Sequence, residues 1–284
     1  MKSKLNIPLE IKNYFYLKNI RFWLLKGMIK VSILPPLNRQ KKVRRIPRNF
    51  FIFGDTMSGK SYLAERFPVP LFLNTDGNSE MIPAQDIQLS NVRDAQGKLK
   101  RSVIDQLDEI ILELKTRNPG YKTIVIDVID DLTVMIEQAI CYENDVQSLA
   151  DIPYGKGYSA FNSVLQSFVV ELKSLPMNVV YISRVAKEGD SDVEVPSLKT
   201  KYYNIVNGNC DLVIQTKRRG KNYIRRVTDR RTHYVREEID DKDILRILDN
   251  VVGVFDKPVK TPIKEQKKIV DKIETEKEVK EGKE

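Results

Sequence analysis

The sequence predicts an α/β fold in which a mostly parallel sheet carries helices on both faces. Short apolar, β-forming runs alternate along the chain with segments of helical periodicity. A glycine-rich turn joins the first of these runs to the first helix. A chain of 284 residues can bury a sizeable core without disulfides. Its 41% hydrophobic and 31% charged residues exclude collagen-like and disulfide-framework proteins.

The net charge of +9 is unevenly distributed, and this predicts the domain organisation. Residues 1–48 hold 13 Lys/Arg and one acid, whereas residues 49–256 hold 26 bases and 31 acids. Residues 257–284 hold nine Lys and seven acids and have no aromatic side chain. We therefore expect a basic N-terminal arm (1–48), a mildly acidic globular domain (49–256) and a charged, disordered or loosely helical tail (257–284).

No uninterrupted apolar run in the sequence approaches the ~20 residues needed to span a membrane. The most apolar stretch, residues 11–25, is interrupted by Lys18 and Arg21. It suits a basic amphipathic helix on a membrane or partner; alternatively, Met28 is the initiator and residues 1–27 are not part of the native protein. The two cysteines, Cys141 and Cys210, form no metal-ligand pattern, which is typical of reduced thiols in a cytoplasmic protein.

The first apolar run, residues 50–53, leads into the pattern GxxxxGKS and then into a helix over residues 62–66. Such a loop points backbone N–H groups at a phosphate, its lysine contacts the β- and γ-phosphates, and its serine hydroxyl binds Mg²⁺. The pattern therefore predicts a site for ATP and Mg²⁺, the alternative being a glycine turn without function. Its residues are Gly54, Asp55, Thr56, Met57, Ser58, Gly59, Lys60 and Ser61.

A second apolar run, residues 122–127, ends in Asp127. An aspartate at the end of a buried strand beside such a loop holds Mg²⁺ through water, so we expect Asp127 to be a metal ligand. The alternative is an acid that caps a helix. Asp130 and Asp131 are interpreted as the polar start of the next helix, over residues 131–139.

The remaining elements complete an alternating pattern. Further strands are expected over residues 69–73, 178–182 and 211–215, and further helices over residues 102–115 and 160–175. In a mostly parallel sheet the carboxyl ends of the strands meet at one edge, where the functional loops lie.

The order of strand, GxxxxGKS and helix, followed by FLNTDG, TIVID and VVYIS, resembles the RecA-like P-loop core. Within that core the chain resembles the single-domain, phage-encoded RecA paralogues of the Sak type, over about residues 50–236. The resemblance implies an ATPase that assists single-strand annealing and recombination.

The same resemblance implies two further site residues. The acid that activates the attacking water falls on Asp76, where RecA-type proteins usually have Glu. The polar residue that senses the γ-phosphate falls on Arg184, where related proteins have Gln or His. The alternatives are an ordinary turn aspartate and a surface arginine at a strand end.

In such ATPases a comparable loop faces DNA, and the resemblance implies that residues 151–158 correspond to it. Tyr154 and Tyr158 would stack on bases while Lys156 meets phosphate; a plain connecting loop is the alternative.

A basic segment follows the last predicted strand, and Gly220 divides it into two β-like runs. This indicates a hairpin that contacts the DNA backbone or lends an arginine (Arg230, Arg231 or Arg236) to the γ-phosphate of a neighbouring subunit, the alternative being a solvated hairpin. The arm residues 39–45 are a second basic cluster, either a phosphate contact or a linker. The hairpin bases are Lys217, Arg218, Arg219, Lys221, Arg225, Arg226, Arg230, Arg231 and Arg236.

Together these features predict a homo-oligomeric ATPase that acts on single-stranded DNA in phage recombination or annealing, with a single-strand binding protein as a further partner. Its place would be the cytoplasm of the bacterial host. Two alternatives remain open: a nucleotide-gated assembly or loader protein with little hydrolysis, and a P-loop kinase of small molecules whose arginine-rich lid the hairpin would form.

Overall fold

The computed structural model describes residues 37, 44–78, 82–187 and 193–281. Contacts between Cα atoms divide the chain into two units, Met1–Val43 and Arg44–Glu284, and every element below belongs to the second. The expected amphipathic helix at residues 11–25, the Met28 start and the basic residues 39–43 lie outside the described residues.

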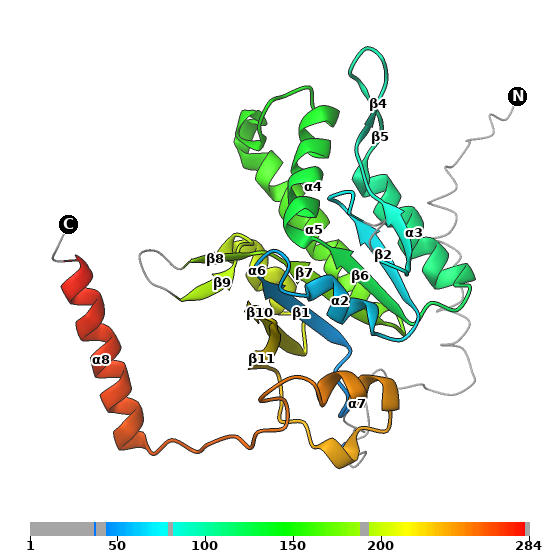
Figure 1. Cartoon of the computed structure of the whole chain (residues 1–284). Coiled ribbons are helices and arrows are strands. Elements are labelled where there is room, and N and C mark those ends of the chain that lie inside the picture. Colours follow the sequence, from blue (N-terminus) through cyan, green and yellow to red (C-terminus); the bar gives the residue numbers. More distant parts are fainter. Residues whose placement is uncertain (1–36, 38–43, 79–81, 188–192, 282–284) are drawn as a thin grey trace, which may run out of the picture. The chain divides into compact units, whose positions relative to one another are not determined.

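The centre of the second unit is a seven-stranded sheet with the order β11-β10-β1-β7-β6-β2-β3 (Figure 1). Neighbouring strands are parallel throughout except β10 and β11, which are antiparallel. This confirms the predicted α/β fold with its mostly parallel sheet. The strands are β1 (Asn49–Gly54), β2 (Pro70–Asn74), β3 (Gln85–Gln88), β6 (Thr123–Asp127), β7 (Asn178–Ser183), β10 (Leu212–Arg219) and β11 (Asn222–Arg230).

Helices cover both faces of the sheet because its central strands are apolar on both sides. Phe50 and Ile52 of β1 pack in one core with α2 and α7, while Phe51 and Phe53 pack in the other with α3, α4, α5 and α6. Burying each such side chain contributes about 1.5–3 kcal/mol. The helices are α2 (Lys60–Glu65), α3 (Val103–Arg117), α4 (Ile129–Glu143), α5 (Lys156–Ser174), α6 (Thr200–Asn207) and α7 (Lys242–Leu248).

The segment expected to be a loop at residues 151–158 is shorter than predicted. Two short 3₁₀ turns, η2 (Leu149–Asp151) and η3 (Pro153–Gly155), lead directly into α5. Tyr154 and Gly155 have φ angles of 60° and 66°, and this left-handed pair sets the start of the helix at Lys156. Lys156 and Tyr158 therefore lie in the first turn of α5, because the helical pattern extends further towards the N-terminus than its apolar residues indicate.

The charged tail is helical, which is one of the two forms that we expected for it. Residues Ile263–Glu281 form helix α8, and its described side chains up to Ile273 are almost all exposed. The segment contains neither glycine nor proline and consists mainly of Lys, Glu and Gln, which favour helix without a buried face. Low hydrophobicity excludes a packed core, but it does not exclude a solvated helix.

Two small hairpins were not predicted: β4 (Val92–Arg93) with β5 (Leu99–Arg101), and β8 (Val185–Lys187) with β9 (Glu194–Pro196). Their strands are only two or three residues long, too short to show the apolar alternation by which strands are recognised. The predicted basic hairpin, in contrast, is confirmed as β10 and β11, with Gly220 at φ 59° in the turn.

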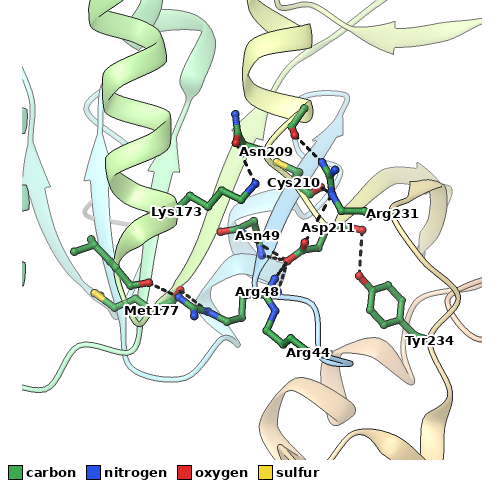
Figure 2. Close-up of polar contacts among 12 residues, drawn as sticks. Arg44, Arg48, Asn49, Lys173, Met177, Asn209, Cys210, Asp211, Arg231 and Tyr234 are labelled. Atoms are coloured by element: carbon green, nitrogen blue, oxygen red, sulfur yellow. Dashed lines mark hydrogen bonds and ion pairs between the residues drawn. The ribbon is translucent and has the colours of Figure 1, made fainter. Parts of the chain in front are cut away.

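Strands β1 and β10 are joined at their beginnings by the carboxylate of Asp211 (Figure 2). It accepts hydrogen bonds from the Arg44 guanidinium (2.5 Å) and from the backbone N–H groups of Arg48 (2.9 Å) and Asn49 (3.1 Å). The guanidinium of Arg48 donates to the carbonyls of Leu175 and Met177 at the end of α5. Residues 44–48, predicted as the end of a basic arm, are thus anchored in the amino edge of the sheet.

Candidate nucleotide-binding site

The GxxxxGKS loop lies between β1 and α2, as predicted. Gly59 has a φ of 84° at the start of α2, a left-handed conformation that favours glycine. A Cβ atom on Gly54 would lie 2.1 Å from the carbonyl oxygen of Thr216 and 2.6 Å from its hydroxyl, so only glycine fits there. The loop therefore runs directly against strand β10, and its first glycine is required by this close approach.

Lys60 lies at the first position of α2 with its side chain folded back along the loop. Its Nζ donates to the carbonyls of Gly54 (2.9 Å) and Asp55 (2.7 Å). Burial lowers the pKa of Lys60, while the nearby Asp127 carboxylate opposes that shift. The ammonium group is thus held in the loop by two carbonyls, where a phosphate anion would complete its partners.

Ser61 and Asp127 meet at the same end of the loop. The Ser61 hydroxyl donates to Oδ2 of Asp127 at 2.6 Å, and Asp127 is only 6% exposed at the end of β6. Burial raises the pKa of Asp127, and the Ser61 hydrogen bond and Lys60 oppose the shift. Mg²⁺ prefers a few oxygen ligands and keeps water and phosphate oxygens as the rest, so this hydroxyl and carboxylate fit it. Bound there, Mg²⁺ would neutralise charge on the phosphates.

These residues border a cavity of about 310 Å³ at the carboxyl edge of the sheet. Asp76, which follows β2, also lines the cavity. Its carboxylate is exposed and accepts hydrogen bonds from the backbone N–H (3.1 Å) and the side-chain amide (2.8 Å) of Asn78. The lining residues include Thr56, Met57, Lys60, Ser61, Tyr62, Asp76, Asp127 and Arg184.

Arg184 lies at the end of β7, the strand between β1 and β6, and its side chain lines the cavity. Its guanidinium forms two hydrogen bonds with the carboxylate of Asp131, at 2.5 and 2.6 Å. Its backbone N–H donates to Asp130, which also accepts from the Ser183 hydroxyl (3.1 Å). Asp130 and Asp131 do lie in the first turn of α4, but sequence reasoning missed that they hold Arg184, because the two segments are 53 residues apart.

Three of the predicted hairpin arginines are occupied by partners within the chain. Arg230 donates to the carbonyls of Gly253 (3.1 Å) and Val254 (2.7 Å). Arg231 donates to the carbonyls of Cys210 (3.0 Å) and Gly208 (2.6 Å) (Figure 2). Arg236 forms two hydrogen bonds with Asp249 at 2.7 and 2.8 Å. These hydrogen bonds within the chain account for the positions of the three guanidinium groups.

The other hairpin bases divide between the two faces of the sheet. On the face towards α6 and β9, Lys217 pairs with Glu194, and Arg226 donates to Gln215 (2.7 Å). On the face towards α2, Arg225 lies opposite Thr216 and Tyr223 lies opposite Arg218. Arg219 and Lys221 flank the exposed turn at Gly220. Lys156 lies apart, on α5, with its Nζ 5.9 Å from the ring centre of Tyr154.

The parallel sheet, the lysine-bearing loop and the adjoining Ser61–Asp127 pair define a P-loop nucleotide-binding site. The sequence model of the AAA domain matches residues 46–239, more than half of the chain, and the protein therefore belongs to this AAA family. Membership of the family indicates nucleotide-binding ATPase activity, typically with Mg²⁺. No curated protein matches the chain. None of the helices in the described residues is long and apolar enough to cross a membrane.

Proposed function

We propose that the protein binds ATP with Mg²⁺ and hydrolyses it while acting on single-stranded DNA as a homo-oligomer. The observation that carries the nucleotide part is the convergence of Lys60, Ser61 and Asp127 around one loop. Asp76 lies on the wall of the same cavity, and it is the acid proposed to activate the water that attacks the γ-phosphate. Arg184 is the residue proposed to sense that phosphate.

The single-stranded DNA part rests on the bases at the hairpin turn. Arg219 and Lys221 are exposed beside Gly220, and neither forms an ion pair among the described residues. A phosphate backbone is the polyanion that such exposed cations bind, with an affinity that falls as salt rises. The biological role proposed for such an ATPase is recombination or strand annealing, as in phage proteins of the Sak type. A single-strand binding protein would be its partner.

Phosphate release by the purified full-length chain, with and without an oligo(dT) strand, tests both parts. We expect release to depend on Mg²⁺, to rise with the strand, and to disappear in Lys60→Ala. The double variant Arg219→Ala/Lys221→Ala should keep the basal rate and lose the stimulation, with Lys242→Ala as a matched surface control. Basal turnover that persists in Lys60→Ala would refute the nucleotide site, and stimulation retained by the double variant would refute the DNA contact.

One observation favours a second candidate, a nucleotide-gated assembly protein with little hydrolysis. Both carboxylate oxygens of Asp76 already accept hydrogen bonds from Asn78, which holds this short side chain on the cavity wall. The two candidates differ in a single measurement. Oligomer formation that requires ATP but persists with a non-hydrolysable analogue, together with turnover at background level, would select the gated protein.

A further inference from the structure

A group of tyrosine and arginine side chains lies beside the P-loop and takes no part in the contacts described so far. Tyr223 of β11 packs against the loop itself, since a Cβ on Gly59 would lie 3.2 Å from its ring. The guanidinium group of Arg218 lies over the ring of Tyr223, 5.6 Å from the ring centre. Tyr62 and Arg66, on the outer side of α2, form a second stack at 4.3 Å. With Arg225, these residues make up what we call the tyrosine–arginine face: Tyr62, Arg66, Arg218, Tyr223 and Arg225.

The charge of this face is unbalanced. Among the described residues, no carboxylate forms an ion pair with Arg66, Arg218 or Arg225, and Arg225 is partly buried. The opposite face of the same hairpin differs, because Glu194 there pairs with Lys217 and accepts a hydrogen bond from Gln215. Arg66 and Arg218 are exposed, but the guanidinium group of Arg225 is partly desolvated, and such a group without a counter-ion favours an anionic ligand. The two rings, each about half exposed (53% for Tyr62 and 52% for Tyr223), leave room for a flat one.

The sheet topology indicates which part of a ligand would reach this face. Asp127, the proposed Mg²⁺ ligand, is at the end of β6. In the sheet, β6 lies on one side of β1 and is separated from it by β7. Strands β10 and β11 lie on the other side of β1. A nucleoside triphosphate whose terminal phosphates lie at Lys60 and Ser61 therefore extends its sugar and base towards β11.

We propose, on the basis of the proposed nucleotide site, that the tyrosine–arginine face binds the nucleoside end of the nucleotide. Tyr223 is the surface on which the base stacks, and Arg225 is the cation beside the sugar and α-phosphate. Stacking on an aromatic ring is favourable for every base. A base of single-stranded DNA could stack in the same way, but the close approach of the Tyr223 ring to Gly59 places the ring beside the phosphate loop and favours the bound nucleotide.

If so, different residues of the basic hairpin bind different ligands. Arg218 and Arg225, which the sequence analysis grouped with the DNA contacts, belong to the nucleotide. Only the turn residues Arg219 and Lys221, with Arg226 on the other face, remain for a nucleic acid strand. Nucleotide binding and strand binding would thus use one hairpin, which gives them a direct physical link.

Calorimetric titration of the full-length chain with Mg²⁺-ATP and, separately, with inorganic tripolyphosphate tests the inference. Tripolyphosphate carries the phosphates without base or sugar. We expect Tyr223→Ala to weaken ATP binding about tenfold while the affinity for tripolyphosphate changes less than about twofold. Tyr223→Phe keeps the ring and should bind ATP as the wild type does, and Arg225→Gln should weaken ATP binding whereas Arg246→Gln, on α7, should not.

Three results would overturn the inference. The first is an equal loss for both ligands in Tyr223→Ala, which would mean that the ring only supports the loop. The second is an unchanged ATP affinity in that variant together with weaker binding of labelled oligo(dT), which would assign the ring to DNA. The third is a wild-type protein that binds ATP no more tightly than tripolyphosphate. Loss of both ligands in Lys60→Ala is a separate test, and its failure would concern the proposed nucleotide site alone.

Discussion

The hydroxyl of Ser58 lies 2.7 Å from the hydroxyl of Thr216, and both side chains are buried. Ser58 belongs to the phosphate-binding loop, whereas Thr216 belongs to β10, three residues before the end of the strand at Arg219. One hydrogen bond thus connects the loop to the strand that continues into the basic hairpin. Because β1 and β10 pair in parallel with Gly54 opposite Thr216, this connection is built into the register of the sheet.

Removing this hydrogen bond should destabilise the loop. In Thr216→Val the shape of the side chain is kept but the Ser58 hydroxyl loses its buried partner, which costs about 1–3 kcal/mol. Urea unfolding of the full chain measures this loss. The control is Thr228→Val on the exposed part of β11, which should be neutral within about 0.5 kcal/mol. If the two variants have the same free energy of unfolding, the Ser58–Thr216 contact does not contribute to stability.

A methyl group on Gly54 should be far more damaging than one on an unobstructed glycine. Its Cβ would overlap the backbone carbonyl of Thr216, which cannot move without shifting β10, so Gly54→Ala should cost more than ~3 kcal/mol and abolish ATP binding. Gly97→Ala is the control, since Gly97 has a φ of 84° but no atom near its Cβ. It should cost about 1 kcal/mol from backbone strain and leave ATP binding intact. Thermal melts with and without Mg²⁺-ATP distinguish the two, and similar melts would contradict the close approach.

The sequence was sufficient for features that lie within one segment or are carried by the pattern of apolar residues. The loop at Gly54–Ser61, the acid at Asp127 and the five predicted strands follow from local spacing and β-forming runs, and the structure contains all of them. The parallel sheet also places Asp76 and Arg184 at the same cavity, because both follow strands that end at one edge.

The features that could not be predicted depend on pairs of residues far apart in the chain. Asp211 was assigned only to the start of a strand, yet it joins Arg44 to the sheet across 167 residues. Tyr223 was one aromatic in a basic hairpin, and its contact with Gly59 follows from how β11 is placed at the sheet edge. No spacing rule on a single sequence reports such contacts. Only Asp131 could have been noticed from its position in the sequence, because it follows the predicted metal ligand Asp127 closely.

The buried carboxylate of Asp127 should make stability depend on pH in the protein without nucleotide and metal. Burial raises the pKa of Asp127, so the native state binds this proton more tightly than the unfolded chain does. Ionisation therefore costs stability above the raised pKa, and the cost disappears as pH falls towards the unfolded value of about 3.9. Asp127→Asn should thus be more stable than the wild type at pH 7.5, by a margin that shrinks as the pH falls through the raised pKa towards about 3.9.

Urea unfolding at several pH values measures this margin, with Asp240→Asn as an exposed control that should show none. Mg²⁺-ATP should then raise the stability of the wild type and have little effect on Asp127→Asn, because the metal ligand is lost. A variant less stable than the wild type at pH 7.5, or a margin that does not change with pH, would contradict the assignment of the shift to burial.

Arg184 should distinguish ATP from ADP, because its guanidinium lines the cavity while Asp131 holds it at 2.5 and 2.6 Å. A cation that contacts only the terminal phosphate contributes to ATP binding and not to ADP binding. We expect Arg184→Ala to weaken ATP binding about tenfold and ADP binding less than about twofold, as measured by calorimetry, and to lower turnover. Asp131→Asn, which weakens the hold on Arg184 without removing it, should leave ADP binding unchanged and keep the preference for ATP. An equal loss for both nucleotides in Arg184→Ala would mean that the arginine supports the end of β7 and does not contact the γ-phosphate.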